Sequence, residues 1–127
     1  LVIGYVGRLA PEKRVETLRL IKQSQINQKI KIVVIGDGPS RSTLEALLPD
    51  AYFAGHQSGK ELGAALASID LLITPGENET FCQVIQEAMA SAVPVVAPAI
   101  QNFLRAPKDI NKILESVQAQ WDALPAL

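Results

Sequence analysis

The chain has 127 residues, of which 48% are hydrophobic, and this is enough for one compact domain with a continuous core. Its 12 basic and 13 acidic side chains leave a net charge of −1 without a basic run, which argues against nucleic acid as a partner. The single cysteine, Cys82, excludes an internal disulfide and a multi-cysteine zinc site, and it favours a cytoplasmic location.

Short β-branched runs alternate with stretches of helical periodicity, a pattern typical of βα units that build a parallel sheet with helices on both faces. Strands are expected at residues 1–6, 30–35, 52–54, 70–74 and 94–97. Helices are expected after residue 13, with Val15, Leu18 and Ile21 on one apolar side, and then at 40–48, 59–68 and 80–91. Ser40 is the expected N-cap of the second helix.

Both ends of the sequence suggest further structure. The first six residues read as a strand already under way, without a basic-then-apolar leader, so we expect a segment before them. No apolar run approaches the ~20 residues that span a bilayer. Near the other end, apolar residues at spacings of three and four predict a terminal helix that packs on a neighbour: Ile110, Ile113, Leu114, Val117, Trp121 and Leu124.

Cationic side chains follow the first predicted strand. Ligands of parallel α/β sheets bind beyond the carboxyl ends of the strands, where helix N-termini also present unpaired N–H groups. Arg8 offers a planar fork and Lys13 a point charge, so together they would suit a diphosphate. Spacing alone equally allows both to be ordinary solvated loop charges.

Two glutamates lie at the start and in the middle of the predicted helix 80–91. Glu79 and Glu87 could each accept hydrogen bonds from vicinal hydroxyls, one from a sugar ring and the other from a ribose. The alternative is structural, since Glu79 could complement the helix dipole and Glu87 could face solvent beside Gln83.

Other reactive groups give weaker signals. Cys82 lies in the first turn of a helix, but a Cys–His hydrolase would need His56, which follows another strand, as its base. The run Gly36-Asp37-Gly38 lacks the third glycine and the later acidic residue of a dinucleotide fingerprint. We interpret it as a turn that lets a base approach the backbone.

Four sequence blocks together resemble the C-terminal domain of the family 4 glycosyltransferases. They are GYVGRLAPEK at 4–13, VIGDGP at 34–39, ETFCQVIQEAMA at 79–90 and PVVA at 94–97, in the family's order. The resemblance implies a Rossmann-like α/β domain that forms one half of a GT-B fold. Residues 1–127 would then be a single nucleotide-sugar-binding domain, a fragment of a larger two-domain chain.

The resemblance also implies roles for individual residues. Arg8 and Lys13 would bind the donor diphosphate, Glu79 would contact the sugar, and Glu87 would hold the ribose hydroxyls. The base would lie near 36–38 and 53–56, while backbone amides at 80–82 would meet the phosphate or the sugar. The implied donor-binding set is Gly7, Arg8, Lys13, Gly36, Gly38, Phe53, His56, Glu79, Thr80, Phe81, Cys82 and Glu87, with Arg8, Lys13 and Glu79 as its catalytic members.

By the same resemblance, the full-length enzyme would transfer a hexosyl group with retention from a nucleoside diphosphate sugar to a lipid or glycan acceptor. No metal or other cofactor would take part. The sequence around residues 75–83 is most similar to bacterial GDP-mannose-dependent α-mannosyltransferases, with UDP-sugars as alternative donors. The acceptor would bind through an N-terminal domain, so this chain alone should be inactive, and the whole enzyme would associate peripherally with the inner face of the membrane.

The sequence departs from the family pattern in two places. Ala92 stands where the family has glycine at a helix end that favours a left-handed backbone. Near Gln101 a Gly-rich segment of the family pattern is missing, either deleted or unseen, which would compromise part of the phosphate and acceptor site.

Two other classes of function stay open on the sequence. One is a non-catalytic α/β module that binds a nucleotide or a protein partner. The other is a GT-B-shaped sugar-nucleotide epimerase or phosphorylase, which would share the crevice but need different catalytic groups in its other half.

Overall fold

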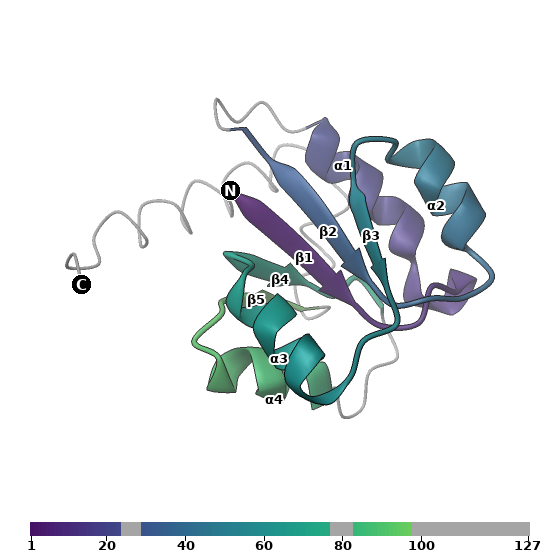
Figure 1. The fold of residues 1–127 in the computed structure, drawn as a ribbon. Coiled ribbons are helices and arrows are strands. Elements are labelled where there is room, and N and C mark those ends of the chain that lie inside the picture. Colours follow the sequence, from purple (N-terminus) through teal and green to yellow (C-terminus); the bar gives the residue numbers. More distant parts are fainter. Residues whose placement is uncertain (24–28, 77–82, 98–127) are drawn as a thin grey trace.

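The protein contains a five-stranded, wholly parallel sheet. The computed structural model describes residues 1–23, 29–76 and 83–97. The strands are β1 (Val2–Val6), β2 (Lys31–Ile35), β3 (Tyr52–Gly55), β4 (Leu71–Ile73) and β5 (Val95–Val96), in the order β3-β2-β1-β4-β5 (Figure 1). Each strand lies within a residue or two of its predicted bounds. The order reverses beside β1, which confirms the expected Rossmann-like class and creates a crevice at the carboxyl ends of the strands.

Helices cover both faces of the sheet. One face carries two 3₁₀ turns, η1 (Pro11–Lys13) and η2 (Val15–Leu18), followed by α1 (Arg19–Lys22) and α2 (Arg41–Leu47). The other face carries α3 (Gly59–Ala67) and α4 (Gln83–Ala90), and the two layers are seen on opposite sides of the strands in Figure 1. Among the described residues, no helix is long and apolar enough to cross a membrane.

Alternate residues of the strands supply two separate cores, as the two-residue period of a strand requires. Ile3, Tyr5, Ile32 and Val34 point to the α1–α2 side, where they pack in one buried cluster with the apolar residues of these helices. On the α3–α4 side, a second cluster is buried between the helices and β4: Leu66, Ile69, Leu72, Ala88 and Val93. Since both faces are filled, the open end of the sheet is left for a ligand.

The expectation of one continuous helix after residue 13 is wrong. Arg14 has a left-handed backbone, with φ 52°, and this conformation separates η1 from η2 before the single turn of α1 begins. A left-handed residue cannot continue a right-handed helix. Val15, Leu18 and Ile21 are nevertheless all buried, so the apolar side was predicted correctly and only the helix type was not.

Ser40 starts α2, but not as the predicted side-chain cap. Its hydroxyl makes no capping hydrogen bond; instead its backbone N–H donates to the carbonyl oxygen of Leu9 at 2.8 Å. Ser40 is buried, so the end of this helix is held by the neighbouring loop rather than by its own side chain.

Ala92 adopts the left-handed conformation expected from the sequence, with φ 57°. The N–H of Val93 donates to the carbonyl of Ala88 at 2.9 Å, and that of Ala92 donates to Met89 at 3.0 Å. These two bonds make a Schellman motif, the usual helix end that selects glycine. An alanine here keeps the motif but carries the steric cost of its Cβ.

Ala92→Gly should therefore raise the free energy of unfolding by about 0.5–1 kcal/mol, the left-handed penalty less the added chain entropy of glycine. Urea unfolding measures this change. Ala90→Gly, at the last helical position of α4, is the matched control and should lower stability by up to about 1 kcal/mol. Equal losses in both variants would contradict the assignment of strain to Ala92.

Candidate functional site

The loops that follow β1 and β2 are joined by backbone hydrogen bonds beyond the ends of the strands. Gly7 N–H donates to the carbonyl of Ile35 at 3.0 Å, and Leu9 N–H donates to that of Asp37 at 2.9 Å. Gly36 N–H donates in turn to the carbonyl of Gly55, at 2.7 Å, after β3. Three loops are thus connected into one continuous backbone surface at the mouth of the sheet.

Glycine is needed where these loops meet. Gly36 has φ +140°, and a Cβ on it would overlap the carbonyl oxygen of Gly7. A Cβ on Gly38, with φ +154°, would overlap the carbonyl oxygen of Leu9. The sequence interpretation placed a nucleobase against these glycines, whereas the structure accounts for them by the close approach of two loops.

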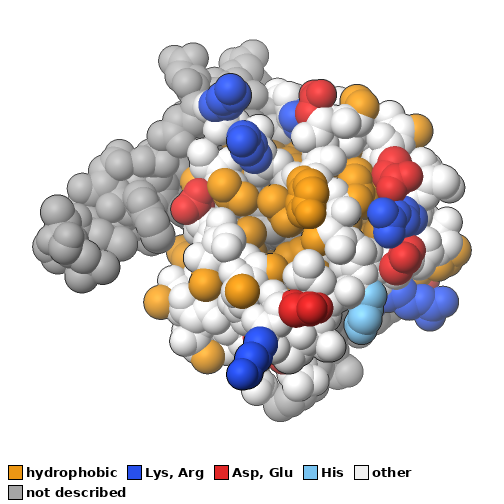
Figure 2. Space-filling model, in the orientation of Figure 1, with side chains coloured by type: hydrophobic (Ala, Val, Ile, Leu, Met, Phe, Trp, Pro, Cys, Tyr) orange, Lys and Arg blue, Asp and Glu red, His pale blue; other side chains and the backbone are white. Residues whose placement is uncertain are grey.

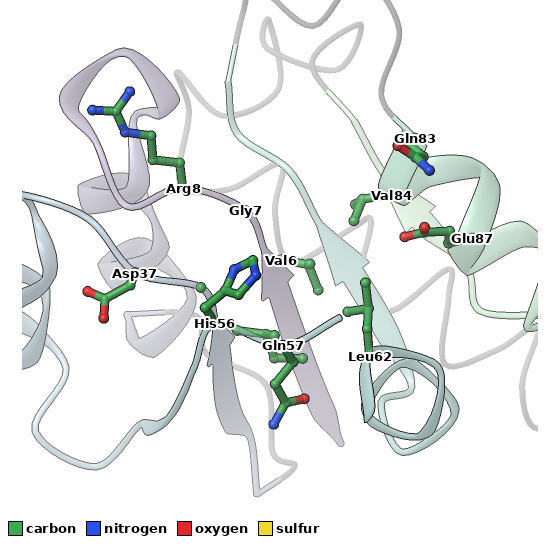
Figure 3. A pocket seen from close by; sticks show the side chains of 12 residues that line it. Val6, Gly7, Arg8, Asp37, His56, Gln57, Leu62, Gln83, Val84 and Glu87 are labelled. Carbon is green, nitrogen blue, oxygen red and sulfur yellow. The ribbon is translucent and has the colours of Figure 1, made fainter. Parts of the chain in front are cut away.

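A cavity of about 570 Å³ opens beside this backbone surface, a size typical of small-molecule sites. Its walls come from the carboxyl ends of β1 and β2, the loop after β3, and the facing sides of α3 and α4 (Figure 3). The lining residues are Val6, Gly7, Arg8, Ile35, Gly36, Asp37, His56, Gln57, Leu62, Gln83, Val84 and Glu87.

The structure brings together five of the residues predicted for the site. They come from four separate segments and all line the cavity: Gly7, Arg8, Gly36, His56 and Glu87. Figure 2 shows the single histidine, in pale blue, at the surface beside charged side chains. Glu87 is half-buried in the cavity wall, which Gln83 also lines, and its contact with a ribose stays a prediction.

Three other predicted residues do not line this cavity. Lys13 is half-buried at the end of η1, and Gly38 lies where its loop meets Leu9. Phe53 packs against the α1–α2 core, with the guanidinium of Arg41 6.0 Å from the centroid of its ring. Glu79, Thr80, Phe81 and Cys82 lie outside the described residues, as do Gln101 and the predicted terminal helix.

Charge is distributed across the cavity rather than concentrated. Arg8 and Glu87 lie on opposite sides of it in Figure 3, one from the loop after β1 and the other from α4. The Arg8 guanidinium is 3.9 Å from the carboxylate of Glu12, but both side chains are mostly exposed. An exposed pair at this distance contributes little stability, so Arg8 can turn to an anionic ligand at low cost.

Asp37 was not predicted as part of the site, and its carboxylate is already engaged. It accepts hydrogen bonds from the N–H of Gly38 at 2.8 Å and from the Arg41 guanidinium at 3.2 Å. The hydrogen bond to Glu45 and the negative charge of Asp37 raise the pKa of Arg41. Asp37 therefore holds its own turn together.

Apart from Glu87, sequence reasoning missed the residues that α3 and α4 contribute to the cavity. Gln83 lies four residues before Glu87, so helical spacing placed it on the same side and could have included it. For Leu62 and Val84 the sequence carried no signal, since apolar residues at helical spacing usually mark core. Gln57, in the loop after β3, belongs to no sequence motif. No cluster of three metal-binding side chains occurs within the described ranges.

Three comparisons relate this chain to known proteins. The model of the family described as glycosyl transferases group 1 matches residues 1–119. A GDP-mannose-dependent alpha-mannosyltransferase of Mycolicibacterium smegmatis is 50% identical over 97 residues, which cover 76% of this chain and 25% of that protein. The chain thus spans about a quarter of the length of this curated relative.

Solved structures share the fold. The catalytic domain of the cholesterol-alpha-glucosyltransferase from Helicobacter pylori superposes with a TM-score of 0.74 at 20% identity, covering 94% of this chain and 86% of that one. An Anabaena protein crystallised with UDP and glucose gives a TM-score of 0.65 at 24% identity, over 79% of this chain and 31% of its own. Such neighbours place the sheet and its helices as one half of a GT-B fold.

Gly36→Ala should lower the free energy of unfolding by about 2 kcal/mol or more, because its Cβ would force the loops after β1 and β2 apart. Gly63→Ala is the control, since nothing lies within 4 Å of a Cβ there. Alanine within α3 should raise stability by up to about 1 kcal/mol. Chemical unfolding of the two variants side by side checks the difference, and a Gly36→Ala variant as stable as the parent would contradict the close approach.

Proposed function

This chain belongs to the glycosyl transferases group 1 family, and from that premise we propose that it is the domain that binds the nucleoside diphosphate sugar donor of a retaining hexosyltransferase. The observation that carries the proposal is the cavity itself. It combines the Arg8 cation after β1 with the Glu87 carboxylate on α4, at the end of the sheet where α/β folds bind nucleotides.

Each group of the donor finds a chemical counterpart. Arg8 can bind the diphosphate as a planar fork, and Lys13 would add a second positive charge from η1. The carboxylate of Glu87 accepts hydrogen bonds only, which suits the two adjacent hydroxyls of a ribose. The base is then left with the side of the cavity formed by His56 and its neighbours.

The reaction we propose needs no metal and no other cofactor. As the bond between the sugar and the diphosphate breaks, Arg8 and Lys13 stabilise the negative charge that develops on the leaving group. The acceptor hydroxyl attacks the same face of the sugar and gives its proton to the departing diphosphate, so the anomeric configuration of the sugar is retained. Glu79 would orient the sugar, and backbone amides at 80–82 would meet the phosphate or the sugar.

The donor we favour is GDP-mannose. The M. smegmatis relative, named for its dependence on that donor, is 50% identical over 97 residues, or 76% of this chain. The Anabaena structure with UDP is 24% identical, a similarity that supports the fold and leaves UDP-sugars as the second choice.

The acceptor would bind outside the described part of this chain. A GT-B cleft forms between two domains, and we propose that the other domain supplies the site for a lipid or glycan hydroxyl. The chain by itself should then bind donor without turning it over. In the full-length protein, peripheral association with the cytoplasmic face of the membrane would bring a lipid acceptor within reach.

Glu87→Gln should weaken binding of the nucleoside diphosphate by about 1–3 kcal/mol, because a charged hydrogen-bond acceptor is lost from the cavity wall. Calorimetric titration with GDP, UDP and ADP measures the change and identifies the preferred base. Glu61→Gln, on the exposed surface of α3, is the matched control and should bind as the parent does. Unchanged affinity in Glu87→Gln would remove this residue from the site, and no binding of any nucleotide to the parent would overturn the proposed function.

Arg8→Ala should weaken binding of the same nucleotide by about 1.5–3 kcal/mol, the usual contribution of a hydrogen bond to a charged group. Arg8→Lys should recover only part of the loss, since an ammonium cannot reproduce the planar fork. Repeating the titrations at low and high salt should show a weaker salt dependence for Arg8→Ala than for the parent. Equal affinity of the parent, Arg8→Ala and Arg8→Lys for the nucleotide would show that Arg8 does not bind the diphosphate.

A further inference from the structure

One polar atom in the cavity wall is buried without a hydrogen-bond partner. The side-chain oxygen Oε1 of Gln57 is closed off from solvent, and no donor among the described residues reaches it. Gln57 follows His56 in the loop after β3, and both residues line the cavity. Native proteins leave few buried acceptors unsatisfied, so each one calls for a physical explanation.

The surroundings of Gln57 do not relieve this cost. Figure 3 shows its side chain pointing away from the His56 ring. Four of the side chains that line the same cavity are apolar, namely Val6, Ile35, Leu62 and Val84. Exchanging the amide oxygen and nitrogen would place a donor in the same position, which needs a partner just as much.

An apolar residue of similar length would fill this position without the penalty. Replacing a buried polar group that has no partner by an apolar one of the same shape is neutral or stabilising. The glutamine at this position is explained if its amide gains a hydrogen-bond partner when the cavity is occupied. The Gln57 side chain forms part of the cavity wall, so a bound molecule would lie next to it. Turning the amide toward a bound molecule would take a rotation about its terminal torsion, which has broad energy wells.

The neighbouring groups indicate which part of a ligand lies there. Under the proposed function, Arg8 faces the diphosphate and Glu87 the ribose, and the Asp37 carboxylate is held by Gly38 and Arg41. Of the polar side chains on the β3 side of the cavity, His56 and Gln57 remain. This is the side on which the nucleobase would be placed.

We propose that the side-chain amide of Gln57 is a specificity-determining contact to the nucleobase, and this inference rests on the proposed function. Oε1 accepts a hydrogen bond from the ring N–H of an imide edge, while Nε2 donates to the carbonyl oxygen beside it. Guanine presents this edge through N1–H and O6, and uracil through N3–H and O4. The acceptor and the donor of the glutamine amide are thus spaced to match the ring N–H and the adjacent carbonyl oxygen of the base.

The test compares the parent protein with Gln57→Met, a near-isosteric variant that keeps the apolar packing and loses the amide. GDP and UDP are titrated first, and whichever binds is then compared with its analogue methylated on the ring nitrogen, N1-methyl-GDP or 3-methyl-UDP. The parent should bind the unmethylated nucleotide about tenfold more tightly, the value of one well-formed hydrogen bond in a cavity. In Gln57→Met this preference should disappear, and the melting temperature of the free protein should be unchanged or higher. Gln23→Met, at an exposed position, should bind as the parent does.

Three results would overturn the inference. A Gln57→Met variant that keeps the parent's preference for the unmethylated nucleotide would show that the amide does not contact the ring N–H. If Gln57→Met bound the unmethylated and the methylated nucleotide more weakly by the same factor, and also melted at a lower temperature, the role of Gln57 would be purely structural. A parent protein that binds neither GDP nor UDP would instead remove the proposed function, and this inference with it.

Discussion

The site depends on the backbone hydrogen bonds that join the loops after β1, β2 and β3. Loops at the open end of a sheet would otherwise have to be held by side chains, whose ordering costs further conformational entropy. Here Gly7, Gly36 and Gly55 connect the three loops through main-chain groups alone. The absence of a Cβ at Gly36 permits the contact, so a rigid surface exists before any ligand binds.

Around that surface, the two helical layers do different things. The α1–α2 side is filled by a large apolar cluster that includes Tyr5, whose hydroxyl donates to the carbonyl oxygen of Arg8 at 2.9 Å. The core thereby fixes the backbone of the residue proposed to bind the diphosphate. The α3–α4 side has a buried cluster of its own and supplies one wall of the cavity, including Glu87. Stability thus comes from the cores on both faces, while the ligand site is placed at the open end of the sheet.

Much of the fold could be predicted because strand and helix periods are local. The five strands, α3 and α4 follow from patterns within a few residues of each other. The left-handed conformation of Ala92 was expected from the glycine that the family pattern has there. Arg14 could not be predicted, since an ordinary residue with positive φ gives no local signal. The hydrogen bond from the Ser40 N–H to Leu9 joins residues 31 apart in the chain, so no local pattern indicates it. The local rule for helix caps therefore predicted a capping bond from the Ser40 hydroxyl, which the structure does not have.

The sequence by itself determined the class of fold, the family, and which loops would meet at one edge, because parallel strands bring their carboxyl ends together. It also placed Arg8, His56 and Glu87 near one crevice, and the cavity contains all three. Only the tertiary structure decided that Phe53 turns to the opposite face and that Gln57 enters the cavity wall with an oxygen left unpaired. Those outcomes depend on which neighbours surround each side chain, and neighbours from separate strands and helices are set by packing in three dimensions.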